Sequence, residues 1–125
     1  MSEVIQKFFD LALDASRIEY ECYELPIEPA YEAVLCHVLA HPESKSEFID
    51  AFIEIAHDPG LAPPQLIEYC MHELRWDDLR RYFSSWLEYE RSERIRHVIR
   101  KFLKAFDDDW PDAGSYTRFG GDDVL

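Results

Sequence analysis

Apolar residues recur at intervals of three and four positions along almost the whole chain, which is the spacing of amphipathic helices. No stretch of useful length alternates apolar and polar residues in the manner of a half-buried strand. The helical pattern is broken at Leu25-Pro26, at Asp58-Pro59-Gly60 and at Pro63-Pro64, because a residue before proline avoids the helical region of backbone space. The sequence therefore predicts an all-α protein of about six helices.

Three of the expected helices have a serine in a capping position. Ser2 precedes a helix that runs to about Cys22, and Ser92 precedes the helix with the most regular apolar spacing. Ser44 and Glu47 have the S-x-x-E spacing of a capping box, which predicts that a helix begins there. The other helices are expected from Pro29 to Ala40, from Pro63-Pro64 onward, and from about Asp77 to Glu90.

Short connections between the expected helices favour antiparallel neighbours. Two arrangements are compatible with this pattern, a compact stack of helical hairpins that resembles HEAT repeats and a closed globular bundle. No internal repeat at a fixed period decides between them, and the hairpin stack is slightly favoured. We expect one helical domain over residues 1–112 and a Gly/Asp-rich C-terminal tail over residues 113–125. In the second expected helix, the positions assigned to the core are Ala33, Val34, Val38 and Leu39.

The charge of the chain is strongly acidic and unevenly distributed. There are 26 Asp and Glu residues against 13 Lys and Arg residues, which gives a net charge of −13. The first 60 residues contain 13 of the acids and only three of the bases, whereas nine of the other bases lie between Arg75 and Lys104. The electrostatic field of such an acidic protein attracts cationic partners, and it repels the phosphates of a nucleic acid. The expected partner is therefore a basic protein and not a nucleic acid.

The expected location is the cytoplasm. No apolar run is long enough to span a membrane, and the first residues lack the basic and apolar regions of a secretion signal. The three cysteines are widely spaced and contain no C-x-x-C pair, which favours reduced thiols over a disulfide framework.

Three acidic clusters are candidate partner-binding surfaces. On the expected third helix, Glu47, Asp50, Glu54 and Asp58 follow one another at helical spacing with no cation among them. On the first helix, Asp10 and Asp14 belong to a charged stripe. After the last helix come Asp107, Asp108, Asp109 and Trp110, and tryptophan is frequent among binding hot spots.

A simpler interpretation of each acidic cluster stays open. The two helical clusters are equally compatible with solvated faces that keep the protein soluble. The charges of Asp107–Asp109 oppose the helix dipole, and Arg100, Lys101 and Lys104 one turn earlier are able to offset them. The bases between Arg75 and Lys104 are expected to pair with nearby acids such as Asp77 and Glu93, with RNA binding as the less favoured interpretation.

No pattern in the sequence announces a catalytic or metal centre. There is no glycine-rich phosphate loop, and no Cys or Ser has a recognisable base beside it. His37 and His41 are spaced to share a helix face but lack a third ligand, and the run after Lys104 lacks the spacing of a calcium loop. We therefore expect a protein that is not an enzyme and needs no metal or cofactor.

Over residues 1–112, the size, charge and absence of catalytic motifs resemble those of small, acidic, all-helical immunity proteins. Bacteria encode these proteins beside polymorphic or contact-dependent toxins. The segments Leu74-Arg75-Trp76 and Asp107-Asp108-Asp109-Trp110 also resemble stretches in bacterial proteins. The resemblance implies an inhibitor that covers the active site or substrate entry of a cognate basic toxin, often a nuclease. The alternative is a helical scaffold, adaptor or homodimer with another cytosolic partner.

Overall fold

The computed structural model describes residues 2–22 and 24–120, which form helices and contain no strand. This confirms the prediction of an all-α protein with six α-helices. Their bounds are α1 Glu3–Glu21, α2 Glu28–Leu39, α3 Lys45–His57, α4 Pro64–Leu74, α5 Asp77–Tyr89 and α6 Glu93–Lys104. Three short 3₁₀ helices complete the fold: η1 Pro42–Ser44, η2 Pro111–Ser115 and η3 Thr117–Phe119.

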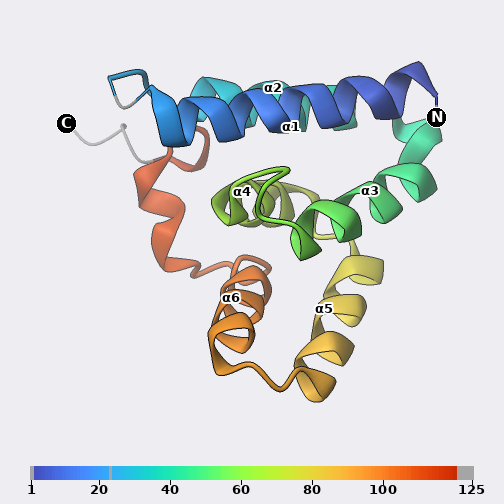
Figure 1. Ribbon diagram of the computed structural model, residues 1–125. Coiled ribbons are helices and arrows are strands. Elements are labelled where there is room, and N and C mark those ends of the chain that lie inside the picture. Colours follow the sequence, from blue (N-terminus) through green and yellow to red (C-terminus); the bar gives the residue numbers. More distant parts are fainter. Residues whose placement is uncertain (1, 23, 121–125) are drawn as a thin grey trace.

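The helices stack as three consecutive pairs. α1 packs along α2 and α5 packs along α6, while α3 and α4 form the middle pair. Between the pairs, α3 contacts both α1 and α5, and α4 contacts both α2 and α6. Figure 1 shows α1 and α2 across one end of the molecule, α5 and α6 at the other end, and α4 between them. These contacts are the ones expected of a stack of helical hairpins.

Two of the three predicted serine caps are confirmed. Ser2 Oγ accepts the backbone N–H of Ile5 at 3.2 Å, and Ser92 Oγ accepts the backbone N–H of Ile95 at 3.3 Å. Each bond satisfies one of the N–H groups that the first turn of a helix leaves without a partner.

The predicted capping box at Ser44 is wrong. Ser44 has φ −102° and ψ 19°, which is not the extended conformation of a capping residue, and its side chain makes no capping hydrogen bond. The 3₁₀ helix η1 leads directly into α3, so that the N–H of Lys45 bonds to the carbonyl of Pro42. The backbone at Ser44 is therefore already part of a turn, and its hydroxyl does not cap α3.

Buried aromatic rings join successive pairs of helices. The ring of Phe8 on α1 lies with its centroid 5.6 Å from Phe48 and 5.0 Å from Phe52, both on α3. On α4, residues 66–71 are all buried without interruption. α4 is therefore the central helix, and a polar residue between positions 66 and 71 is buried on whichever side it lies.

One residue assigned to the core is exposed. Leu39 of α2 is 46% exposed, because the buried residues of this helix are Tyr31, Val34, Leu35 and Val38. At 3.6 residues per turn, Leu39 lies about 90° around the helix axis from the centre of that stripe. Val34 and Val38 are buried as predicted, and Ala33 is half-buried.

The C-terminal segment is part of the packed domain as far as it is described. Tyr116 and Phe119 are half-buried against the core, and the ring of Tyr116 lies 4.9 Å from that of Tyr69 on α4. The predicted boundary at residue 112 therefore does not mark the end of the packed structure. Residues 121–125 of the predicted tail lie outside the described residues.

Within the part of the chain that the structure describes, none of the helices has the length and apolar character needed to cross a lipid bilayer.

Candidate functional site

The α3 carboxylates form an acidic surface that no cation neutralises. Glu47, Asp50, Glu54 and Asp58 are all exposed, and no Lys, Arg or His nitrogen of the described residues lies within 4.0 Å of their oxygens. Their nearest donors are uncharged. The hydroxyl of Ser2 lies 3.5 Å from Glu47 Oε2, and Asp58 Oδ1 accepts the backbone N–H of Gly60 at 2.9 Å.

The cation at the start of α3 points away from this surface. Lys45 Nζ lies over the ring of Trp76, 5.2 Å from its centroid. Its charge is therefore satisfied by an aromatic face and is not used against the neighbouring carboxylates. The charge of the α3 surface stays uncompensated as a result.

A furrow separates this surface from α1. Its lining joins Ser2, Ile5 and Phe9 of the α1 side to Glu47, Asp50, Ala51 and Glu54 of α3, and it has a volume of about 210 Å³. Farther along α1, a second hollow of about 360 Å³ is bordered by Leu13, Asp14, Tyr20 and Gly60 among others. We call the exposed carboxylates Asp10, Asp14, Glu47, Asp50, Glu54 and Asp58, together with these two hollows, the acidic face.

The α1 members of the acidic face are weakly engaged. Gln6 Nε2 donates to Asp10 Oδ1 at 3.0 Å, and Arg17 lies 3.9 Å from Asp14 with both side chains more than half exposed. Exposed pairs of this length contribute little to stability. Leu13 and Tyr20, each 52% exposed, add apolar surface between the charges. The acidic face therefore combines negative charge with large apolar side chains.

The third predicted cluster is organised differently. Lys104 pairs with Asp107 at 3.2 Å and with Asp109 at 3.3 Å, and Arg75 pairs with Asp108 at 2.9 Å. The carboxylates after α6 are exposed but already hold cations, as the simpler interpretation required. Lys104 provides this compensation together with Arg75, which the sequence analysis did not assign to it.

Trp110 is not available to a partner in this structure. It is only 4% exposed, and its ring stacks on Tyr116 at 5.9 Å and 18° and lies 4.8 Å from His72. The assignment of Trp110 to a binding surface is therefore corrected: its ring anchors the C-terminal segment to α4. The aspartates before it stay on the surface.

Most of the basic residues of α5 and α6 are paired locally. Arg81 lies 3.1 Å from Asp77 and 3.4 Å from Asp78, and Arg100 lies 2.8 Å from Glu93. Arg80 and Arg96 also pair with acids on their own helices. These cations are engaged by acids close to them in sequence, and within the described residues none of them pairs with the α3 carboxylates.

Glu68 on α4 is a buried carboxyl group that the sequence analysis did not single out. It is 2% exposed, and burial raises its pKa to about 7, while the charge of Lys101 and a hydrogen bond from Trp110 act in the opposite direction. The spacing of apolar residues did not indicate that Glu68 is buried, because the continuous burial of residues 66–71 follows from how the neighbouring segments pack on α4.

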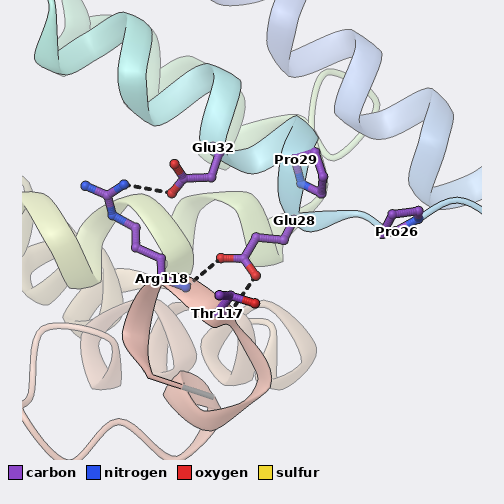
Figure 2. Close-up of a pocket in the computed structure, with 6 residues that line it drawn as sticks. All are labelled: Pro26, Glu28, Pro29, Glu32, Thr117 and Arg118. Carbon is purple, nitrogen blue, oxygen red and sulfur yellow. Dashed lines mark hydrogen bonds and ion pairs between the residues drawn. The ribbon is translucent and has the colours of Figure 1, made fainter. Parts of the chain in front are cut away.

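A second polar cluster holds the C-terminal segment against α2. The carboxylate of Glu28 accepts the backbone N–H groups of Thr117 at 2.7 Å and of Arg118 at 3.0 Å, as Figure 2 shows. The guanidinium of Arg118 lies 2.8 Å from Glu32 and 3.2 Å from Glu73. We call Glu28, Glu32, Tyr69, Glu73 and Arg118 the C-terminal clasp.

The polar groups of the C-terminal clasp bond to one another and hold the C-terminal segment in place. Burial alone would raise the pKa of Glu32, but hydrogen bonds from Tyr69 and Arg118 lower it below its usual value. The Tyr69 hydroxyl lies 2.8 Å from Glu28 and 2.6 Å from Glu32, and burial followed by these two carboxylates raises its pKa. The hollow of about 500 Å³ in Figure 2 is therefore lined by polar groups that already bind one another.

Metal ligands are not gathered anywhere in the described ranges, where no group of three or more His, Cys, Asp or Glu side chains is placed to hold an ion. His37 Nε2 lies 2.8 Å from the carbonyl oxygen of Val4, and His41 Nδ1 lies 3.2 Å from Glu43. The two histidines that share a helix face thus have separate partners.

Comparison of the chain with protein-family models, with curated proteins and with solved structures found no match.

Proposed function

We propose that this chain is a non-enzymatic inhibitor of the immunity-protein kind, which binds a cognate basic toxin through the acidic face. The observation that carries the proposal is the row of exposed α3 carboxylates Glu47, Asp50 and Glu54, none of which has a cationic partner among the described residues. In the same molecule, bases on α5 and α6 pair with their own neighbours.

Helix energetics support a binding role for α3. Negative charge near a helix C-terminus opposes the macrodipole, at roughly 0.3–1 kcal/mol per group, and Glu54 and Asp58 lie in and just after the last turn of α3. Like charges one turn apart also repel by a few tenths of a kcal/mol. The surface therefore reduces the stability of its own helix, as functional surfaces often do.

The chemistry of the surface suits a nuclease toxin. Along a helix that rises 1.5 Å per residue, Glu47, Asp50 and Glu54 succeed one another about every 4.5 to 6 Å. Phosphates along one nucleic-acid strand rise about 3.4 Å each, so the row presents charge at a comparable density. The carboxylate row could therefore occupy the cationic cleft of a nuclease in place of the nucleic-acid strand. Leu13 and Tyr20 supply apolar contacts beside it, and tyrosine is frequent at the centres of interfaces.

The buried thiol of Cys70 is poorly suited to act as a nucleophile. Cys70 is fully buried, and burial raises its pKa. A thiol in this environment is a poor nucleophile, because the thiolate is the reactive form.

Growth protection tests the proposal. The partner to use is the C-terminal domain encoded by the open reading frame directly upstream, expressed alone or with this chain in the same cells. We expect the domain alone to arrest growth and the wild-type chain to restore it. The triple variant Glu47→Gln, Asp50→Asn, Glu54→Gln is expected to lose protection, because neutralising three interface charges lowers affinity by about 10- to 100-fold.

The matched control changes three exposed carboxylates that lie off the acidic face, with the same change in net charge: Glu24→Gln, Glu88→Gln and Asp112→Asn. We expect this variant to protect like the wild type. Protection by both triple variants would exclude the acidic face as the binding site, and failure of the wild-type chain to protect would reject the inhibitor function.

A further inference from the structure

A separate pocket lies where the end of α3 and the turn to α4 meet α5 and α6. Figure 1 shows α5 and α6 at the end of the molecule opposite α1 and α2. Its volume is about 350 Å³, within the range of sites for small molecules. Six of its apolar lining residues are Ile55, Ile67, Trp86, Ile95, Val98 and Phe102. We call it the apolar pocket.

The pocket interrupts an otherwise closed apolar layer. Ile55, Ile67 and Phe102 are at most 1% exposed, whereas Ile95 and Val98 on the apolar stripe of α6 are only half-buried. These two side chains pack against the core and also line the pocket. Pro59 and Pro64 in its lining fix the backbone of the turn that covers it. The pocket is open in this structure, and the two prolines restrict the backbone beside it.

Two of the polar groups in the lining are occupied. Glu90 accepts the indole N–H of Trp86 at 2.9 Å with one oxygen and the backbone N–H of Ser92 at 3.0 Å with the other. His57 stacks on Trp86 with a centroid distance of 3.9 Å, and its Nε2 lies 2.7 Å from the hydroxyl of Tyr82.

Arg94 is the exception in this lining. No carboxylate of the described residues lies within 4.0 Å of its guanidinium, although the chain has twice as many acids as bases. Arg94 also lies in the first turn of α6, where the helix dipole disfavours a cation. An anion at the mouth of the pocket would satisfy the guanidinium through paired N–H donors.

We propose that the apolar pocket binds a small amphipathic carboxylate, whose hydrocarbon part enters between α4 and α6 and whose carboxylate pairs with Arg94. The inference does not depend on the proposed inhibitor function, because the acidic face lies on α1 and α3 and shares no lining residue with this pocket.

The experiment uses octanoate as the probe, with 1-octanol and octylamine as matched neutral and cationic compounds. Trp86 lines the pocket, whereas Trp76 and Trp110 are not in its lining, so the three indole N–H signals in a ¹H–¹⁵N spectrum provide the readout. The signals are assigned with single Trp→Phe variants. We expect octanoate to move the Trp86 signal saturably and more strongly than those of the other two tryptophans. We also expect octanoate to bind more tightly than the alcohol and the amine.

Two variants separate the head group from the tail. Arg94→Gln should weaken octanoate binding by about 5- to 20-fold, the loss of one charge-assisted contact, and leave octanol binding unchanged. Arg91→Gln, an exposed arginine outside the lining, should change neither. Val98→Trp should fill the cavity and abolish binding of both compounds, with Ile95→Phe as a second filling variant if the first does not fold.

Three results would overturn the proposal. These are an unmoved Trp86 signal at millimolar octanoate, binding of octylamine at least as tight as that of octanoate, and equal losses in the Arg94 and Arg91 variants.

Discussion

Glu68 shows how burial changes the chemistry of a single side chain. Its folded-state pKa of about 7 lies above the ordinary value of 4.5 because the carboxylate would be desolvated. A raised carboxyl pKa means that the folded protein binds this proton more tightly than the unfolded chain does. The contribution of Glu68 to stability is therefore fully present below about pH 4.5 and is lost as the pH rises through 7.

Replacement of Glu68 by glutamine should remove this pH dependence. Between pH 5 and pH 8 we expect the free energy of unfolding of Glu68→Gln to rise relative to wild type by about 2–3 kcal/mol. Urea denaturation at the two pH values measures the difference. Glu88→Gln, which changes an exposed carboxylate on α5, is the control and should show no such rise. An equal rise in both variants would mean that burial of Glu68 is not the cause.

Two single residues, Trp110 and Glu68, could not be placed correctly from the sequence. Trp110 was assigned to a partner surface because acids surround it in sequence, yet it is buried. Glu68 was not singled out, yet its carboxyl group lies against that same tryptophan. Neither position could be inferred from spacing, because both follow from the return of the C-terminal segment onto α4.

At the scale of the element, the N-termini of three helices show where a serine in the sequence was enough to predict a cap and where it was not. The caps at Ser2 and Ser92 depend on the serine and the three residues after it, and both are present. Ser44 has the same local pattern, but the turn η1 before it changes its backbone conformation. At these three positions, the serine caps its helix where its own backbone is extended and does not where the backbone is already part of a turn.

Serine-to-alanine variants test this distinction. Ser92→Ala should lower the free energy of unfolding by about 1 kcal/mol, because the N–H of Ile95 loses its acceptor. Ser44→Ala should change it by less than about 0.5 kcal/mol, since no cap is lost. Urea denaturation of both proteins gives the comparison, and a larger loss at Ser44 would contradict the observed geometry.

The C-terminal clasp is an element whose contribution can be measured separately. Arg118→Ala should lower the free energy of unfolding at pH 7 by about 1–2 kcal/mol, because its partners Glu32 and Glu73 are only partly exposed. The amides of residues 117 and 118, which bond to Glu28, should exchange with solvent faster. Arg91→Ala, at an exposed arginine with no ion pair in the described ranges, is the control.

The pH dependence of the clasp has the opposite sign to that of Glu68. The pKa of Glu32 is lowered in the fold, so its contribution is present above the ordinary value of 4.5 and is lost as the pH falls through the lower folded value. The difference between Arg118→Ala and wild type should therefore shrink below about pH 4. A difference that stays constant into acid would show that the arginine acts through packing alone.

At the scale of the whole molecule, charge and fold were predicted with different success. The helical periodicity predicted the all-α class and six helices, and the stacked pairs are among the arrangements it allowed. The location of uncompensated charge was a hypothesis from α3 alone. The structure adds that Ile5 and Phe9 of α1 face the α3 carboxylates across a furrow, and that Asp14 borders a second hollow with Gly60. Both bring together residues more than 40 positions apart, which no local pattern reveals.

The acidic face should also have a measurable effect on stability in the absence of any partner. Repulsion along α3 is relieved when Glu47, Asp50 and Glu54 are neutralised, so the triple variant should be as stable as wild type or more stable. Loss of partner binding in that variant is then a property of the surface and not of unfolding.

The most direct measurement is affinity capture of the tagged wild-type protein from lysate of its own cells, eluted along a salt gradient, in parallel with the two triple variants. The account predicts one basic polypeptide that wild type and the control variant retain until high salt and that the variant at Glu47, Asp50 and Glu54 does not retain. Equal retention by all three proteins, or recovery of the chain itself alone, would contradict the account and favour a scaffold or homodimer.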